Sequence, residues 1–191
     1  QFLNENFSQI KSDNIKRQNI LKEDLTKYNK IIGNLPYYIT SSIIEHLVLN
    51  GINCEKIVLM TQKEVYPKLT KVNDSPLSMF LNYVATISEP INVSRNNFAP
   101  VPHVDSVVFT LTPNENIKNE QNKKLFKLIK QMFLMRRKNI LNNLANYTKN
   151  KGFAGEILKK LAVDTNKRPE ELDINFYINL LKELELNKTQ E

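Results

Sequence analysis

Hydrophobic and polar positions change their spacing along this 191-residue chain, and the changes separate three kinds of segment. In the first half, short apolar runs typical of buried strands alternate with stretches whose apolar residues recur every three or four positions, as in helices. The strand candidates are 30–33 and 56–60, and the helix candidates are 41–49, 63–69 and 77–87. Strands and helices in alternation are typical of a parallel sheet whose faces are covered by helices.

A strand-like pattern follows the last of these helices. Polar and apolar residues alternate at 91–95, an apolar run occupies 104–111, and the loop between them contains Pro100 and Pro102. Two strands joined by such a loop predict an antiparallel hairpin that closes the sheet. Upstream, the short run at 19–22 is a weaker strand candidate.

The last part of the chain has helical spacing throughout. A polar stretch at 112–121 precedes it, and apolar residues then recur at intervals of three and four as far as Leu184. We therefore predict an α/β domain at 1–114, followed by a small all-α domain at 115–191.

The composition is that of an ordinary globular protein, with 41% hydrophobic and 25% charged residues. No run of about 18 apolar residues is present, so the sequence predicts no membrane span. Cys54 is the single cysteine, which excludes an intrachain disulfide and fits a reducing compartment. His46 and His103 lack metal-ligand spacing, so we expect no metal site. We expect a cytoplasmic location, and the excess of lysine over arginine is also compatible with an organelle of AT-rich descent.

Positive charge is concentrated in one segment of a chain whose net charge is +7. Residues 121–160 contain eleven basic residues and a single acid, whereas residues 1–120 are neutral overall. A basic block on a balanced chain is typical of contact with nucleic-acid phosphates, and the alternative is a solvated lysine-rich surface. Arginine is scarce elsewhere, so we predict that Arg136, Arg137 and Lys138 bind the nucleic acid.

The strand candidate at 30–33 is followed by Asn34-Leu35-Pro36-Tyr37. Ligands of open α/β sheets bind beyond the carboxyl ends of the strands, where this tetrapeptide is expected to lie. The Asn34 side-chain oxygen and the Leu35 carbonyl can each accept one hydrogen of an exocyclic amine. Pro36 fixes the turn without an N–H of its own, and Tyr37 can stack on a base. These groups are suited to holding an adenine, although Asn and Pro are also common in ordinary turns.

Four further motifs follow this one along the chain. They are Gln62-Lys63-Glu64-Val65, Phe98-Ala99-Pro100-Val101-Pro102-His103-Val104-Asp105-Ser106, Arg136-Arg137-Lys138 with Asn142-Asn143-Leu144, and Arg168-Pro169-Glu170-Glu171-Leu172. Together with Asn34 to Thr40, their order resembles the ribosomal RNA adenine N6-dimethyltransferase family. Members of that family use S-adenosylmethionine to dimethylate two adjacent adenines near the 3′ end of small-subunit rRNA. The resemblance extends from Glu23 to Leu181.

The resemblance implies a Rossmann-like class I methyltransferase domain followed by a helical rRNA-binding domain. It also implies S-adenosylmethionine as the cofactor, the pre-small ribosomal subunit as the partner, and a role in maturation of that subunit by a monomer. In the family, an aromatic residue at the position of Phe98 lies beside the target base, which would place the base between Phe98 and Tyr37. Asp24 matches the residue that accepts from the cofactor's adenine amine, and Asn34 also lies beside the cofactor in the family.

The chain departs from the family pattern at its beginning. Family members have a glycine-rich loop after the first strand and an acidic residue after the second, which hold the methionine and ribose parts of the cofactor. This sequence starts at Gln1 and has four glycines, none of them in a G-x-G-x-x-G pattern. We therefore expect an N-terminally truncated methyltransferase domain, without its first strands and most of its cofactor-binding loop. Activity of these 191 residues alone is left open.

Two other functions stay open on the sequence. Large-subunit rRNA adenine methylases of the macrolide-resistance type share the N-x-P-Y and F-x-P-x-P motifs, although the runs at 136–138 and 168–172 favour the small-subunit enzyme. A non-catalytic RNA-binding or ribosome-assembly factor is the other alternative, favoured by the missing glycine loop and disfavoured by the intact motif at 34–37. A DNA adenine methylase is less favoured, because those enzymes usually have an acidic residue where Asn34 stands.

Overall fold

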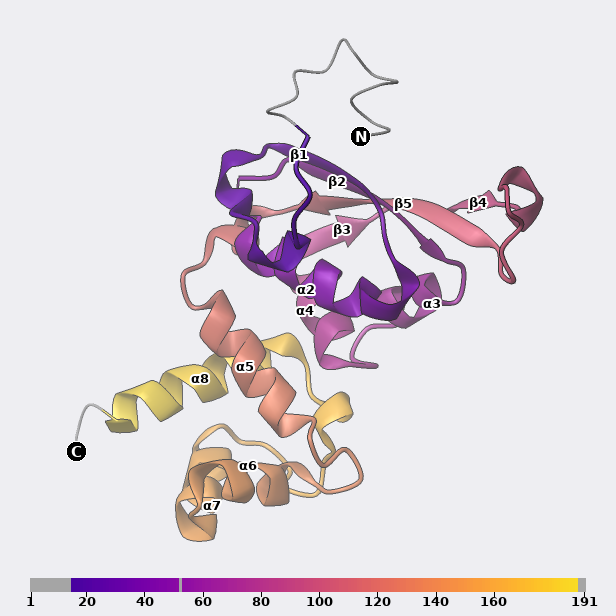
Figure 1. Cartoon of the computed structure of the whole chain (residues 1–191). Coiled ribbons are helices and arrows are strands. Elements are labelled where there is room, and N and C mark those ends of the chain that lie inside the picture. Colours follow the sequence, from indigo (N-terminus) through magenta and orange to yellow (C-terminus); the bar gives the residue numbers. More distant parts are fainter. Residues whose placement is uncertain (1–14, 52, 189–191) are drawn as a thin grey trace.

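The computed structural model describes residues 15–51 and 53–188. The strands are β1 (Lys30–Asn34), β2 (Lys56–Gln62), β3 (Ala85–Ile87), β4 (Ile91–Val93) and β5 (Ser106–Pro113). The helices are α2 (Thr40–Asn50), α3 (Val65–Thr70), α4 (Pro76–Val84), α5 (Asn122–Met132), α6 (Ile140–Thr148), α7 (Lys151–Lys160) and α8 (Ile174–Lys188). Figure 1 shows the sheet above α2, α3 and α4, with α5 to α8 gathered below them. The predicted order of an α/β part followed by an all-α part is confirmed.

The sheet is built around β2. β2 pairs in parallel with β1, with Met60 opposite Asn34, and antiparallel with β5, with Gln62 opposite Ser106. The strand order is β1-β2-β5-β3, and β4 pairs with the beginning of β5 as an antiparallel hairpin. The predicted hairpin is therefore confirmed. The parallel pairing predicted for the strands before the hairpin is also confirmed by β1 and β2, which form the single parallel pair among the described strands.

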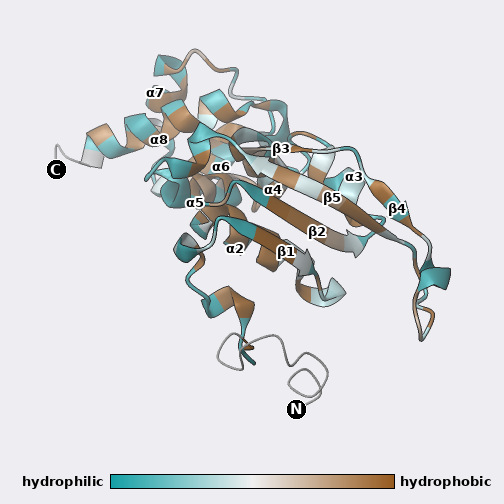
Figure 2. Ribbon diagram, turned by 90° about the horizontal axis from the view of Figure 1, so that it is seen from above, coloured by the Kyte–Doolittle hydropathy of each residue, from teal (hydrophilic) through white to brown (hydrophobic). Residues whose placement is uncertain are grey.

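One face of the sheet carries the core of the α/β part. Ile57 and Leu59 of β2 are fully buried, as are Ile44 and Leu47 of α2. Figure 2 shows β2 and β5 as hydrophobic along most of their length. The sequence predicts helices on both faces, but in the described residues the helices packed on the sheet lie on one face, and Ile32 of β1 is 86% exposed.

Two predicted elements differ from the structure. The strand expected at 19–22 is a short 3-10 helix, because the Asn19 side chain accepts the Leu21 N–H at 3.0 Å and favours a local turn over an extended strand. The helix expected at 77–87 ends at Val84, and its last three residues form β3. Pairing of β3 with β5 outweighs the local helical spacing of this segment.

The helices below the sheet share a continuous core with the α/β part. The rings of Phe80 in α4 and Phe126 in α5 have centroids 5.1 Å apart, and both side chains are buried. Tyr177 of α8 is fully buried, and its hydroxyl donates to the Pro169 carbonyl at 2.7 Å. This bond joins the last helix to the segment before it.

The strands end close to the predicted domain boundary, since β5 ends at Pro113. The division into domains at 1–114 and 115–191 itself stays a prediction. None of the helices in the described part of the chain is long and apolar enough to cross a membrane.

Replacing Tyr177 with Phe removes a buried hydrogen bond without creating a large cavity. The Pro169 carbonyl loses its short bond and keeps the Leu172 N–H, which donates to it at 3.4 Å, so we expect the free energy of unfolding to fall by about 0.5–1.5 kcal/mol. Urea unfolding followed by circular dichroism measures this difference. Tyr147→Phe is the matched control, because Tyr147 is 36% exposed and its hydroxyl has no partner in the described residues. Equal stability of the two variants would show that the buried bond contributes nothing.

Candidate functional site

The Asn34–Tyr37 turn begins where β1 ends. The Leu35 N–H donates to the Met60 carbonyl at 3.0 Å, so the turn stays attached to β2 for one residue beyond β1. Pro36 has φ −64°, and a short 3-10 helix, Tyr37–Ile39, leads directly into α2. The predicted strand, turn and helix are confirmed, and they place the exposed Asn34 side chain at the carboxyl end of a strand.

Two oxygen acceptors in this turn are free. The Pro36 carbonyl is occupied, because it accepts from the Thr40 hydroxyl at 3.2 Å and from a backbone N–H at 3.2 Å. The Leu35 carbonyl and the Asn34 side chain, in contrast, make no hydrogen bond within the described part of the chain. A shallow cavity of about 390 Å³ is lined by Asn34, Leu35, Pro36 and Tyr37.

The Tyr37 ring is fixed at one end and open on its face. Its hydroxyl lies 3.4 Å from the Ser106 hydroxyl, at the beginning of β5, and 41% of the residue is exposed. Beside it, the Asp105 carbonyl accepts the Lys63 N–H at 3.0 Å, and the Asp105 carboxylate accepts the Arg95 N–H at 3.0 Å. Asp105 and Ser106 therefore hold the base of the hairpin.

Phe98 lies in the loop at the outer end of the β4–β5 hairpin. Figure 2 shows this hairpin projecting on the side toward which β1 and β2 run. The loop is held by Arg95, whose guanidinium donates to the His103 carbonyl at 3.1 Å. Phe98 is partly exposed and is not among the residues that line the Asn34–Tyr37 cavity. Its role opposite Tyr37 stays a prediction.

Asp24 caps a short 3-10 helix, Leu25–Lys27, just before β1. Its Oδ1 accepts from the Thr26 hydroxyl at 2.7 Å and from the Thr26 N–H at 3.0 Å, and these bonds lower the pKa of the carboxyl. Oδ2 makes no hydrogen bond in the described residues, so one oxygen of this ionised carboxylate is available to a donor. The cofactor-binding role of Asp24 stays a prediction.

The neighbouring Glu23 is the centre of a charged cluster. Lys27 approaches its carboxylate at 2.5 Å, and the Tyr28 hydroxyl donates to it at 2.8 Å. Gln18 also donates to it, and Lys16 lies 3.9 Å away. The hydrogen bonds from Lys27 and Tyr28, with the positive charges of both lysines, lower the pKa of Glu23 to about 2. Sequence analysis missed this cluster, because its acid and its partners are common surface residue types.

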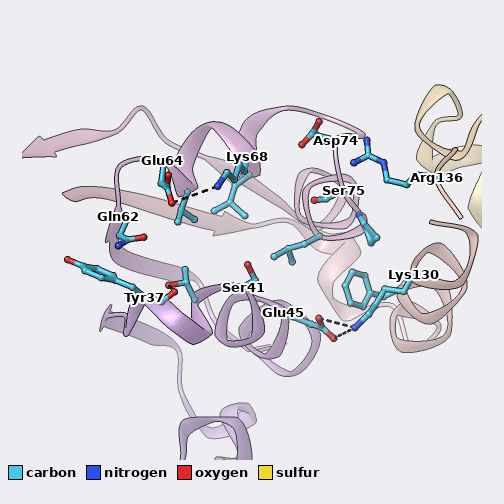
Figure 3. A pocket seen from close by; sticks show the side chains of 16 residues that line it. Tyr37, Ser41, Glu45, Gln62, Glu64, Lys68, Asp74, Ser75, Lys130 and Arg136 are labelled. Atoms are coloured by element: carbon cyan, nitrogen blue, oxygen red, sulfur yellow. Dashed lines mark hydrogen bonds and ion pairs between the residues drawn. The ribbon is translucent and has the colours of Figure 1, made fainter. Parts of the chain in front are cut away.

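A groove of about 540 Å³ leads from the turn toward the helical part. Figure 3 shows Tyr37 at one end of it and Lys130 and Arg136 at the other. Its walls come from α2, the end of β2, α3, the beginning of α4 and α5. The candidate catalytic turn and the predicted nucleic-acid-binding run, 99 positions apart when counted from Tyr37 to Arg136, therefore border the same groove.

Charged side chains of both signs line this groove. The Lys130 ammonium of α5 pairs with the Glu45 carboxylate of α2 at 3.2 Å, and Lys68 pairs with Glu64 at 3.9 Å. The first pair joins the two parts of the molecule, and sequence analysis did not find it because its members are 85 residues apart. No cluster of His, Cys, Asp or Glu that could hold a metal ion is present in the described residues.

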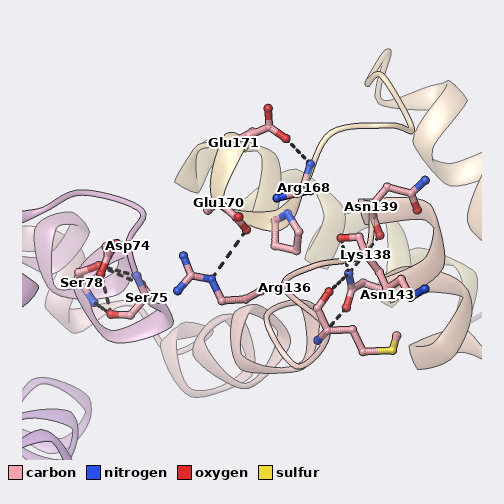
Figure 4. Close-up of polar contacts among 12 residues, drawn as sticks. Asp74, Ser75, Ser78, Arg136, Lys138, Asn139, Asn143, Arg168, Glu170 and Glu171 are labelled. Carbon is pink, nitrogen blue, oxygen red and sulfur yellow. Dashed lines mark hydrogen bonds and ion pairs between the residues drawn. The ribbon is translucent and has the colours of Figure 1, made fainter.

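The run at 136–138 lies in the loop between α5 and α6, and Figure 4 shows Arg136 directed toward Glu170. The Arg136 Nε lies 3.9 Å from the Glu170 carboxylate, and its guanidinium lies 5.9 Å from the centre of the Phe133 ring. Arg137 and Lys138 are exposed, and their side chains pair with no other described residue. Arg137 and Lys138 are therefore the cations of this run that are available to a ligand.

The sequence matches a family model described as ribosomal RNA adenine dimethylase over residues 1–186. A similar protein is ribosomal RNA small subunit methyltransferase A of Mycoplasma capricolum, 38% identical over 170 residues. The match covers 84% of this chain and 64% of that protein. This chain therefore spans less than two thirds of the length of that relative.

Two solved structures resemble this fold. One is a dimethyladenosine transferase from Plasmodium falciparum, with a TM-score of 0.73 and 27% identity over 91% of this chain and 72% of that one. The other is the 23S rRNA methyltransferase ErmE, with a TM-score of 0.55 and 21% identity over 87% of this chain and 70% of that one. The second likeness shows the fold alone. The first supports the Rossmann-like methyltransferase architecture expected from the sequence.

The depressed pKa of Glu23 predicts an acid-sensitive contribution to stability. The folded-state pKa of about 2 lies below the ordinary value of 4.5, so the ionised form is the one that folding favours. The contribution is complete above pH 4.5 and is lost as the pH falls toward 2. We expect Glu23→Gln to lower stability at neutral pH and to flatten its decline between pH 5 and pH 3.

Urea unfolding at a series of pH values tests this expectation. Glu64→Gln is the control, because the Glu64 side chain is 68% exposed and its pair with Lys68 spans 3.9 Å. The control variant should keep the pH profile of the unmodified protein. A Glu23→Gln profile parallel to that of the unmodified protein would mean that the cluster does not stabilise the fold.

Proposed function

This chain belongs to the ribosomal RNA adenine dimethylase family, and we propose that it transfers methyl groups from S-adenosylmethionine to N6 of two adjacent adenines near the 3′ end of small-subunit rRNA. The observation that carries the proposal is the pair of free acceptors at the end of β1. The Asn34 amide oxygen and the Leu35 carbonyl stand beside an open aromatic ring, Tyr37, in a solvent-facing cavity. The name of the Mycoplasma relative supports the same assignment.

The two acceptors address the main difficulty of the reaction. The lone pair of an exocyclic adenine amine is delocalised into the ring, which makes the nitrogen a poor nucleophile. Gripping both N–H bonds, with Asn34 on one and the Leu35 carbonyl on the other, favours a pyramidal nitrogen whose lone pair points toward the methyl donor. The methylated nitrogen is acidic enough to release its proton to water, so no strong base is required. Positioning and fixed dipoles then supply most of the rate enhancement.

The target base must leave its stack before it reaches this turn, as for other base-modifying enzymes. The exposed face of Tyr37 offers one stacking surface, and its hydroxyl contact with Ser106 fixes the ring's orientation. We assign the opposite surface to Phe98, on the hairpin that β5 anchors. Pro36 keeps the turn rigid and supplies no competing N–H.

The residues present fit one side of the cofactor. Asp24 retains a free carboxylate oxygen suited to an adenine amine, and Asn34, ten positions later, lies at the end of β1. When bound, S-adenosylmethionine supplies an electrophilic methyl group on a sulfonium. We assign Asp24 and Asn34 to holding it.

The partner we propose is the pre-small ribosomal subunit, bound in the cytoplasm by a monomer of this protein. Structured rRNA is recognised largely through its shape and backbone, and exposed cations supply that contact. Arg137 and Lys138 are exposed and unpaired within the described chain, and Arg136 borders the groove that leads to Tyr37. The groove gives the RNA a path between the basic run and the catalytic turn.

Asn34→Ala removes one of the two acceptors and should lower the rate of methyl transfer by about 10²–10³. The measurement is transfer of label from S-adenosylmethionine to undermethylated small ribosomal subunits, with the product of the complete reading frame as the enzyme. Asn166→Ala, at an exposed position of the helical part, should retain the full rate. Label must be recovered as N6,N6-dimethyladenosine.

Other outcomes of this assay identify the alternatives. Transfer to naked large-subunit rRNA in place of small subunits would indicate an enzyme of the resistance type. RNA binding without transfer to either substrate would indicate an assembly factor. Equal rates for Asn34→Ala and the unmodified protein would contradict the mechanism.

Tyr37 offers a separate test of stacking. Tyr37→Phe keeps the ring and loses the contact with Ser106, so we expect a rate within a few-fold of the unmodified protein. Tyr37→Ala removes the stacking surface, worth about 1–3 kcal/mol per base, and should lower kcat/KM by roughly tenfold or more. A larger loss for Tyr37→Phe than for Tyr37→Ala would show that the hydroxyl, and not the ring, matters.

A further inference from the structure

The loop between α5 and α6, residues 133–139, is called the basic loop here, and a single buried side chain organises it. Asn143 of α6 is 1% exposed. Its Nδ2 donates to the carbonyls of Met135 at 3.2 Å, Lys138 at 3.2 Å and Asn139 at 3.1 Å. Its Oδ1 accepts the Met135 N–H at 3.3 Å. Figure 4 shows this amide enclosed by the loop.

The backbone of the basic loop is closed at both ends. The Lys138 N–H donates to the Met135 carbonyl at 2.8 Å, which makes a tight turn of the segment that carries the two arginines. Asn139 caps α6 by accepting the Asn142 N–H at 3.0 Å. Asn143 reaches both the turn and the cap, so it fixes the position of Arg137 and Lys138 relative to α6.

The three cations of this loop differ in their contacts. Arg136 is directed to the carboxylate of Glu170 and the ring of Phe133. The positive charge of Arg136 also contributes to the lowered pKa of Asp74, after the larger effect of Lys71. Arg137 and Lys138 remain exposed and pair with no other residue in the described ranges.

Three basic residues of the surrounding block are paired with acids. Lys124 pairs with Glu185 at 2.7 Å, and Lys160 pairs with Glu183 at 2.6 Å. Lys130 pairs with Glu45 across the groove. Arg137 and Lys138 therefore stand out as adjacent, unpaired cations on a backbone that is already ordered. Phosphate binding to such a loop does not carry the entropic cost of ordering it.

We infer that Asn143 is a positioning residue, which holds Arg137 and Lys138 preformed for the phosphates of an RNA backbone. In this arrangement Arg136 anchors the loop to Glu170 and is not a principal phosphate ligand. The identity of the nucleic acid as RNA rests on the proposed function. The positioning role rests on the contacts of Asn143.

The test is RNA affinity as a function of salt concentration, with an unmodified transcript of the 3′-terminal part of small-subunit rRNA as the probe. Each phosphate contact that is lost reduces the slope of log K against log[salt] by about 0.7–0.9. Arg137→Gln combined with Lys138→Gln should reduce the slope by about 1.5. Asn143→Asp, which loses the three donated bonds at nearly constant shape, should reduce the slope by a similar amount.

The chain offers a matched control for the charge that Asn143→Asp introduces. Asn142 is exposed, and Asn142→Asp places the same negative charge one residue away without removing a bond to the loop. Asn142→Asp should keep the slope of the unmodified protein. A slope lowered equally by the two variants would show that charge alone acts, and would overturn the inference.

Two further variants separate positioning from general stability. In the background of Arg137→Gln and Lys138→Gln, Asn143→Asp should cause no further loss of affinity, because it acts through those two cations. An additive loss would overturn the inference. Arg136→Gln should reduce the slope by less than Arg137→Gln or Lys138→Gln, because the Glu170 carboxylate already lies beside the Arg136 charge. If Asn143→Asp fails to fold, Asn143→Ser, which keeps one donor, replaces it, and its salt slope is compared with that of the unmodified protein.

The outcomes for this loop and for the methyl transfer are distinguishable. Affinity changes as described, with no methyl transfer by the unmodified protein, would overturn the proposed function and leave the positioning role standing. Normal methyl transfer together with an unchanged slope for Asn143→Asp would overturn the positioning role and leave the proposed function standing.

Discussion

The candidate site depends on the register of β2, because this strand holds both of its neighbours in fixed positions. Parallel pairing with β1 places Asn34 opposite Met60, and antiparallel pairing with β5 places Ser106 opposite Gln62. A shift of one residue in either ladder would exchange the buried and exposed faces of the strand. The fully buried Ile57 and Leu59 oppose such a shift, so the core fixes where the turn and the hairpin meet.

The second requirement is that the helical part stays oriented against the sheet. Packing of Phe126 on Phe80 supplies the apolar contact, and the Lys130–Glu45 pair crosses the groove beside it. The ion pair is partly exposed and by itself contributes little to stability. The pair joins α5 to α2 at the end of the groove opposite Tyr37, so it favours one orientation of the helical part. Burial of the two rings stabilises the contact between the α/β part and the helical part, and the ion pair favours their relative orientation.

The basic block illustrates why sequence charge and surface charge differ. Eleven basic residues lie between positions 121 and 160, but acids of α2, α8 and the segment before α8 pair with four of them. The positive field of the folded molecule is therefore concentrated at cations that pair with no acid in the described residues, which include Arg137 and Lys138 of the basic loop. Asn143 matters there because a neutral amide can satisfy loop carbonyls without cancelling the neighbouring charge.

The sequence by itself determined the features that depend on neighbouring residues. Proline and asparagine chemistry predicted the turn at 34–37, alternation predicted the β4–β5 hairpin, and helical spacing predicted the helices after residue 121. The turn and the helices form from contacts within a few positions, and the hairpin pairs residues 13 to 17 positions apart, so their patterns are visible without a fold. The motifs also gave the family, because five of them occur in a fixed order.

The tertiary structure alone decided the features that join distant parts of the chain. Residues 85–87, which the sequence predicts as the end of a helix, form β3 because they pair with β5. The tertiary structure also placed the Tyr37 hydroxyl 3.4 Å from the Ser106 hydroxyl, and it gave Arg136, but not Arg137, an acidic neighbour in Glu170. Each outcome depends on contacts between groups that are far apart in the sequence. The spacing of residues along the chain does not predict such contacts.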